Sequence, residues 1–297
     1  MKMKFFTKLV LIGALSISMI APTIAMQNLS GQQIVAEAAT VRLSKKALKL
    51  KVGQKATLTV KGTSKKVKWS VGNKYVATVN KKGKVSAVSN GSTYVYAKVG
   101  NKTLSCIVTV TFDAAKAKSN ISCQLQDTGS GVVAILKNNN KFSVNIDAKL
   151  AYYKDGAMID TAEDYNPTFE NGKECALFFH EPEDADYNDL SYDDYKISIS
   201  VTPSSYASHV SAISEQHSIS QAGVTTEATN TSKYEIDISR VACVMYNASG
   251  KAIGYDYHYL DCKYSGDTDY FTFSFPYDSD YNTIIPTSCK VYINSAY

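Results

Sequence analysis

Short runs of alternating apolar residues, separated by glycine and asparagine turns, dominate residues 40–112. The stretch VKWSVGNKYVATVNKKGKVSA, residues 67–87, is typical: apolar residues alternate with lysine, serine or threonine, and Lys-Lys-Gly separates two such runs. Alternation with a period of two places successive side chains on opposite faces of a strand, and turn residues at this spacing favour hairpins. We find no helical period here. These residues are therefore expected to form an antiparallel β-sandwich.

The same residues resemble a known family. The ordered elements LKLKVGQKATLTV, VKWSVGNKYVATVNKKGKVSAVSNGSTYVYAKV and LSCIVTV are similar to the bacterial Ig-like domain of group 2, over about residues 41–111. The resemblance implies a spacer or adhesive role in a bacterial surface protein, with no catalytic residues. It also implies that Trp69 and Val79 belong to the core. A ligand contact by Trp69 is the alternative.

Charge divides the chain in two. Residues 40–112 contain Arg42 and fifteen lysines but no Asp or Glu, a formal charge of +16, whereas residues 113–297 carry 13 basic and 26 acidic residues, a charge of −13. Lysines on outward faces and turns keep strand edges soluble, or they attract a polyanion with a strength that falls with salt. The candidate polyanion-binding residues are Lys45, Lys46, Lys65, Lys66, Lys81, Lys82 and Lys84.

The expected partner of these lysines is an anionic cell-wall polymer or glycan, such as a teichoic acid. Anionic lipid headgroups are an alternative. Nucleic acid is not expected, because the chain carries an export signal and the aromatic stacking platforms of single-strand binders are not evident.

The export signal is residues 1–39, which we interpret as a cleaved signal peptide. Three lysines precede an apolar run of twelve residues, 9–20, which Pro22 ends. A run of this length is short for a membrane span and suits a secretory signal. Cleavage after Ala25 and cleavage after Ala38 are both compatible with the sequence. The mature chain is thus expected to be secreted, without a transmembrane segment, and associated with the cell wall.

An internal repeat runs through the acidic part. PEDADYN at residues 182–188 recurs as PYDSDYN at residues 276–282, an offset of 94 that becomes 92 further upstream. Two units cannot supply the continuous core of a solenoid, so the repeat predicts two similar domains. Both copies are rich in β-prone runs that end in glycine turns. Their YYKDGAMI and MYNASGKAI segments resemble the FxLYD type of Ig-like domain, although the F-x-L-x-D letters are not reproduced.

The predicted organisation is all-β: three tandem Ig-like β-sandwich domains after the signal peptide. The basic Ig-like domain occupies residues 40–112, and the two acidic sandwiches occupy residues 113–204 and 205–297. The sequence does not indicate an oligomeric state.

The repeated loops carry alternating oxygen side chains, as at the start of a calcium loop. Both lack Gly at the sixth position and Glu at the twelfth, which excludes an EF-hand. A looser Ca²⁺ site and an acidic turn whose side chains bond their own backbone are the two alternatives. Ca²⁺ is the one cofactor considered, and its candidate ligands are Asp184, Asp186, Asn188, Asp278, Asp280 and Asn282.

Other polar and aromatic residues give weaker signals. Tyr255, Tyr257 and Tyr259 would share one face of a strand and could stack on sugars. Export permits disulfides, with Cys243 paired to Cys262 or Cys289 as the favoured choice. The four histidines show no metal spacing, and no nucleophile elbow or zinc motif occurs, so the chain is predicted to be non-enzymatic.

The leading hypothesis is a non-enzymatic binding or adhesion protein of the cell surface or wall. Its basic module would be retained on anionic wall polymers, and its acidic domains would be displayed outward. A purely structural spacer and a secreted carbohydrate-binding accessory protein are the alternatives.

Overall fold

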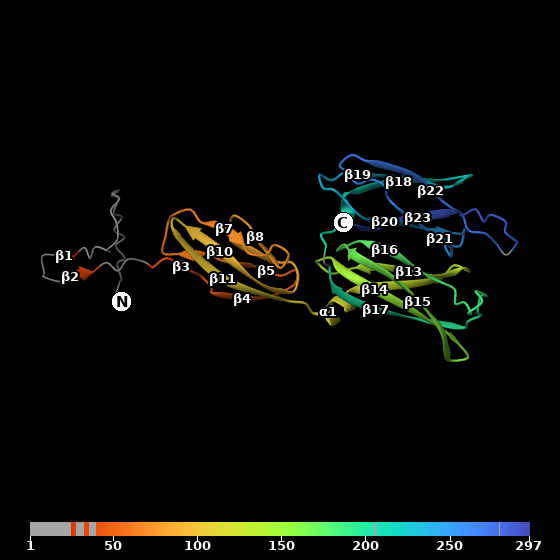
Figure 1. The fold of residues 1–297 in the computed structure, drawn as a ribbon, viewed down its shortest axis with the longest axis horizontal. Coiled ribbons are helices and arrows are strands. Elements are labelled where there is room, and N and C mark those ends of the chain that lie inside the picture. Colours follow the sequence, from red (N-terminus) through yellow and green to blue (C-terminus); the bar gives the residue numbers. More distant parts are fainter. Residues whose placement is uncertain (1–24, 28–32, 36–39, 205, 279) are drawn as a thin grey trace, which may run out of the picture.

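The structure is a computed structural model that describes residues 25–27, 33–35, 40–204, 206–278 and 280–297. The predicted signal peptide lies almost wholly outside these residues. Only the short strands β1 (Ala25–Gln27) and β2 (Gln33–Val35) belong to it, and they pair antiparallel. None of the described helices has the length and apolarity needed to span a bilayer. Figure 1 shows an elongated chain in which residues 42–111 precede two further sandwiches stacked on each other.

Residues 42–111 form a two-layered sandwich. One layer is a four-stranded sheet in the order β4-β11-β10-β7, in which β4 runs parallel to β11, and the facing strands are ordered β5-β9-β8 and β3-β6. Alternate residues of these strands fill the core, with Leu58, Val85, Val95 and Cys106 fully buried. The strands are β3 (Arg42–Leu43), β4 (Ala47–Lys51), β5 (Lys55–Thr57), β6 (Val60–Lys61), β7 (Lys68–Val71), β8 (Ala77–Val79), β9 (Lys84–Ala87), β10 (Gly91–Val99) and β11 (Lys102–Thr111).

A short helix, α1 (Ala114–Ser119), connects this sandwich to the next one. Asp113 caps the helix by accepting a hydrogen bond from the Lys116 backbone N–H at 3.1 Å. The two sandwiches also touch directly. Gly53 has a φ of +80°, and a Cβ added there would come within 2.7 Å of the Phe142 ring. The Phe142 ring also meets Phe112 edge-on, with centroids 6.1 Å apart, so the joint combines a capped helix with aromatic packing.

One fold, present twice, makes up residues 121–296. The first copy has sheets ordered β12-β13-β16 and β15-β14-β17, and the second has sheets ordered β18-β19-β22 and β21-β20-β23. Each strand thus has a counterpart six strands later, so the repeat in the sequence is also a repeat of the fold. This confirms the all-β prediction for the acidic part.

The strands of the first copy are β12 (Ile121–Asp127), β13 (Gly131–Asn138), β14 (Val144–Lys154), β15 (Ala157–Phe169), β16 (Glu174–His180) and β17 (Asp194–Pro203). A 3₁₀ turn, η1 (Val210–Ala212), precedes the second copy. Its strands are β18 (Ile213–Ser220), β19 (Gly223–Asn230), β20 (Ser239–Tyr246), β21 (Ala252–Tyr259), β22 (Thr268–Phe273) and β23 (Ser288–Ala296).

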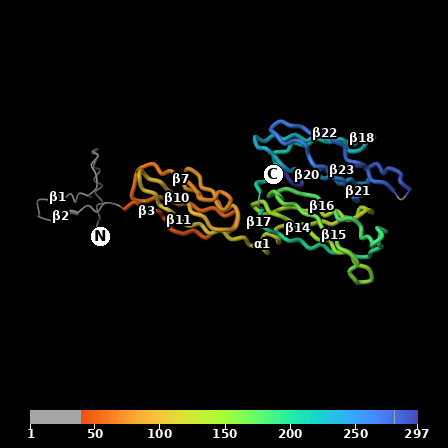
Figure 2. Tube along the Cα trace, in the orientation of Figure 1, coloured from red at the N-terminus to blue at the C-terminus, as the bar shows by residue number. Residues whose placement is uncertain are grey.

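The two copies are stacked sheet against sheet, as Figures 1 and 2 show. The β12-β13-β16 sheet of the first copy faces the β21-β20-β23 sheet of the second. Val133 and Ala176 from one side pack with Ala242 and Val244 from the other, and all four are fully buried. The result is a four-layered block with an apolar seam in the middle.

Polar contacts fix the position of the copies at this seam. Asn294 accepts a hydrogen bond from the Ala176 backbone N–H at 3.0 Å and donates one to the Ala176 carbonyl at 2.6 Å. Arg240 donates to both carboxylate oxygens of Asp164, at 2.9 and 3.0 Å, and each side chain is only 12% exposed. Such bidentate pairs hold one geometry, so the seam defines a single orientation of the two copies.

The outer sheet of the second copy, β18-β19-β22, has a different chemistry from its buried counterpart in the first. Ala176, which is covered, corresponds to Tyr270, which is 72% exposed. Phe178, in the seam, corresponds to Thr272, which faces solvent. The same fold therefore carries apolar residues on the sheet that is covered and polar residues on the sheet that is bare.

Candidate functional site

The lysines of residues 40–112 are the most prominent chemical feature of the surface. All fifteen are exposed. Among the residues that the structure describes, one of them forms an ion pair: Lys51 Nζ lies 2.8 Å from Asp113 Oδ2, at the joint. The other positive charges of this module are not covered by the acidic copies, which stack on each other instead.

The seven candidate lysines fall into groups on different parts of the sandwich. Lys45 and Lys46 lie just before β4, which is one edge of the four-stranded sheet. The pair at 65 and 66 lies just before β7, which is the opposite edge. The remaining three, at 81, 82 and 84, lie in the β8–β9 turn or begin β9. Whether the seven act together in binding a polyanion stays a prediction.

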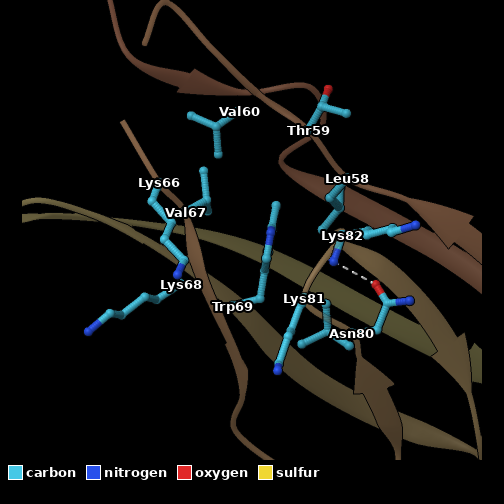
Figure 3. Close-up of a pocket in the computed structure, with 11 residues that line it drawn as sticks. Leu58, Thr59, Val60, Lys66, Val67, Lys68, Trp69, Asn80, Lys81 and Lys82 are labelled. Carbon is cyan, nitrogen blue, oxygen red and sulfur yellow. Dashed lines mark hydrogen bonds between the residues drawn. The ribbon is translucent and has the colours of Figure 1, made fainter. Parts of the chain in front are cut away.

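A cleft of about 650 Å³ opens at the β7 edge of the module, between the two layers. β7 forms one wall, and the segment leading into β6 and the β8–β9 turn form the other (Figure 3). Its apolar lining residues are Leu58, Val60, Val67, Trp69 and Val79. Its lysines are Lys66, Lys68, Lys81 and Lys82.

Trp69 belongs both to the core and to the cleft. Its side chain is half-buried and packs against the core cluster of the module. The indole lies so close to Gly83, whose φ is +76°, that a Cβ at that glycine would come within 2.7 Å of the ring. The backbone N–H of Leu58 donates to the Gly83 carbonyl at 2.9 Å and holds this arrangement. The predicted core role of Trp69 and the alternative ligand contact are thus compatible.

The turn that carries two of the cleft lysines is fixed by Asn80. Its side-chain oxygen accepts hydrogen bonds from the backbone N–H groups of Lys82, at 2.9 Å, and Lys84, at 3.0 Å. This is the Asx-turn geometry expected of asparagine before a glycine-containing turn. Because that acceptor is occupied, the side chains at this end of the cleft offer mainly hydrogen-bond donors to a ligand.

The candidate calcium loops form matching turns at the end of the block that faces away from residues 42–111 (Figure 1). Asp184 Oδ1 accepts hydrogen bonds from the backbone N–H groups of Asn188 and Asp186, at 2.9 and 2.8 Å. Asp278 accepts the equivalent bonds from Asn282 and Asp280, each at 2.9 Å. The bonds from the asparagine and then from the middle aspartate hold the pKa of each first aspartate below its ordinary value.

These bonds correspond to the acidic-turn alternative, because one carboxylate oxygen of the first aspartate in each loop already accepts two backbone hydrogens. The side-chain amide of Asn188 also donates to Asp184, so it points its nitrogen rather than its oxygen toward the carboxylate. Within the described part of the chain, no three His, Cys, Asp or Glu side chains are grouped to hold a metal ion. Calcium binding stays an untested prediction of the sequence.

Addition of millimolar Ca²⁺ is therefore expected to leave the melting temperature of the protein unchanged. The physical reason is that Ca²⁺ would have to displace the hydrogen bonds that close both turns. Differential scanning calorimetry with Ca²⁺ and then with excess chelator provides the measurement. A rise that the chelator reverses would contradict the turn interpretation and restore the six candidate ligands.

The predicted tyrosine face is partly used by the fold. Tyr255 stacks on Phe178 across the seam, with ring centroids 4.8 Å apart and planes 6° from parallel. Tyr257 and Tyr259 lie further along β21 and are 52% and 54% exposed. Only these two remain accessible to a sugar.

The cysteines are free thiols in the described structure, so the proposed pairing of Cys243 is not formed. Cys243 and Cys289 pack in one core cluster, whereas Cys262 belongs to another. Burial raises the pKa of Cys175 to about 12 and that of Cys123 to about 11. Because the thiolate is the nucleophilic form, these two side chains are poorly suited to covalent catalysis.

The basic module matches a known family. Residues 37–110 fit the model of the bacterial Ig-like domain (group 2). The match confirms the family resemblance of the basic part. The Trp69 cleft therefore lies within the stretch that is similar to the bacterial Ig-like domain.

Comparisons with curated proteins and with solved structures do not identify a function. No curated protein matches the chain. A solved structure described as the S-layer protein SbsC, domains 5-6, aligns with 48% of this chain and 90% of its own length, at 18% identity and a TM-score of 0.22. A similarity this low supports no inference about function.

Proposed function

We propose that this chain is an exported, non-enzymatic protein of the cell surface that is retained on an anionic wall polymer through its bacterial Ig-like domain. The acidic four-layered block is then displayed outward. The observation that carries the proposal is the set of fifteen exposed lysines, of which one is paired with a carboxylate in the described structure.

The charge distribution supports this orientation. Residues 40–112 carry +16 and residues 113–297 carry −13, and the two parts lie at opposite ends of the elongated chain (Figure 1). Many weak, screened attractions to one polymer add up at physiological ionic strength. The same polymer repels the acidic block, which favours an arrangement with residues 113–297 away from the wall. The resemblance of the two acidic copies to FxLYD-type domains remains part of this proposal.

A structural spacer is the second candidate function. The elongated arrangement and the rigid seam between the acidic copies favour it, because both would hold the C-terminal block at a distance from the surface. A spacer needs no polymer ligand, so retention on purified polymer distinguishes the two functions.

Binding of the full chain to an immobilised teichoic acid is expected to weaken steadily as the salt concentration rises from about 0.05 to about 0.5 M. Screening of exposed charges becomes strong over this range. Neutralising Lys45, Lys46, Lys65, Lys66, Lys81, Lys82 and Lys84 is expected to lower affinity about tenfold or more without unfolding the protein, since exposed charges contribute little to the core. Surface plasmon resonance across a salt series measures both effects.

The matched control neutralises the same number of exposed lysines in residues 113–297, among them Lys141, Lys173, Lys233 and Lys251. This control is expected to bind within about twofold of the unmodified chain, because it leaves the lysines of residues 40–112 intact and its added negative charge lies on the block away from the polymer, where salt screens it. Tight binding that ignores salt would contradict the electrostatic mechanism. Absence of binding at low salt would contradict retention and leave the spacer function.

A further inference from the structure

We propose that the Trp69 cleft binds an anionic sugar unit, with one face of the sugar ring against the indole and its carboxylate or phosphate among the cleft lysines. This inference rests on the proposed function, that residues 40–112 hold an anionic polymer. It goes further, because it assigns a specific recognition site and the chemical class of the unit recognised.

The cleft has more apolar lining than the attraction of a polyanion by charge alone would need. A polyanion held by charge needs only exposed lysines, and this module offers them on both edges of its sheet. The cleft adds five apolar side chains, Trp69 among them. Small-ligand sites are concave and mostly apolar with a few polar groups at defined positions, and their volumes are about 300–1,000 Å³. At about 650 Å³, this cleft has the size and composition of such a site.

The polar groups of the cleft select a ligand that accepts hydrogen bonds and carries negative charge. Lys66 and Lys68 lie on one side of the indole, and Lys81 and Lys82 lie on the other (Figure 3). Residues 40–112 supply no carboxylate to compete for them. An amine or a cation would meet mainly donors and like charges here, which is unfavourable.

A sugar ring with an acidic group satisfies both parts of the site. One face of a pyranose ring presents C–H groups that can pack on an aromatic side chain, while the acidic group reaches the lysines. A linear phosphate polymer has the charge but no ring, and a neutral sugar has the ring but no charge. Both a uronic acid and a sugar phosphate have the required combination.

Trp69 provides a direct readout, since it is the single tryptophan of the chain. Its fluorescence in the full-length protein reports occupancy of the cleft and not binding elsewhere. Four probes separate the contributions. Tetragalacturonate supplies a sugar ring with a carboxylate, and a phosphorylated maltodextrin supplies a sugar ring with a phosphate. Inorganic polyphosphate supplies negative charge alone, and maltotetraose supplies the sugar ring alone.

We expect at least one of the two anionic sugars to shift the Trp69 emission in a saturable manner. Polyphosphate is expected to bind without shifting the emission, and calorimetry measures that binding separately. Maltotetraose is expected to leave the emission unchanged. If polyphosphate shifts the emission as strongly as the anionic sugars, the cleft reads charge only and the proposal is wrong. If neither anionic sugar changes the emission, the proposal is equally wrong.

A pair of variants with equal charge tests the location. Lys66→Ser with Lys81→Ser removes two charges at the cleft, and Lys49→Ser with Lys55→Ser removes two charges on β4 and β5, the edge strands at the opposite side. The first variant is expected to lose about tenfold in affinity for the anionic sugar, and the second less than about twofold. Equal losses would overturn the cleft while leaving polymer retention intact. Failure of the polymer to bind at all would instead overturn the proposed function.

Discussion

Replacement of Ala176 by arginine is expected to separate the two acidic copies. Ala176 is fully buried in the seam, and its backbone N–H and carbonyl both bond to the Asn294 side chain. An arginine there would bury a charge with no partner, which costs several kcal/mol. For a block of this size, we expect the melting temperature to fall by about 10 °C.

Small-angle scattering and limited proteolysis measure the consequence. The variant is expected to have a larger radius of gyration and to be cut near residues 203–209, between the copies. The control is Tyr270→Arg at the equivalent position of the second copy, where the side chain is 72% exposed and the sheet is bare. That variant is expected to melt within about 2 °C of the unmodified protein, in line with ordinary surface changes. Equal effects of the two arginines would contradict the assignment of the seam.

Replacement of Trp69 by alanine is expected to destabilise residues 40–112 by about 3 kcal/mol. This is the lower end of the range for loss of a large aromatic side chain, because the indole is only half-buried. The loss comes from the packing of the indole against the core cluster of residues 40–112 and from its close approach to Gly83. The acidic block has core clusters of its own, which meet that of residues 40–112 only through partly buried residues such as Phe112 and Phe142, and it should stay folded.

Amide hydrogen exchange is the suitable measurement, because it resolves residues 40–112 from the rest and does not need the lost fluorophore. Trp69→Phe serves as the control, since a phenyl ring keeps most of the packing and is expected to cost about 1 kcal/mol. If Trp69→Ala left protection in residues 40–112 unchanged, the indole would belong to the cleft alone and have no part in the core.

The sequence carries enough information to predict the strands but not their higher assembly. The alternation in residues 91–111 appears in the structure as strands whose every second side chain is buried. The offset of 94 likewise predicts that the loops at 182–188 and 276–282 have one geometry, which they do. Local patterns are sufficient here because each strand or turn is determined by its own residues.

The strands of the seam have a sequence pattern that the alternation of apolar and polar residues does not explain. GVVAILK and ECALFFH, at β13 and β16, are apolar on both faces, whereas GVTTEAT and TDYFTF in the second copy are mixed. Continuous apolar runs indicate a strand covered on both sides. The same runs do not show what covers the outer side, since the partner residues on β20 and β21 are distant in the sequence. The cleft was not predictable for a similar reason: Trp69 and Lys81 meet only once β7 lies opposite the β8–β9 turn.

The seam also changes the number of independent structural units in the chain. The sequence contains three sandwiches, but removal of either acidic copy would leave an apolar sheet of the other in water, with Val133, Ala176 and Phe178 uncovered on one side and Ala242 and Val244 on the other. Neither copy is therefore a self-sufficient part that could be transplanted or deleted by itself. In terms of modular architecture, the chain has two units: a basic one with a core of its own, which Phe142 of the next sandwich contacts, and an acidic one that exists only as a pair.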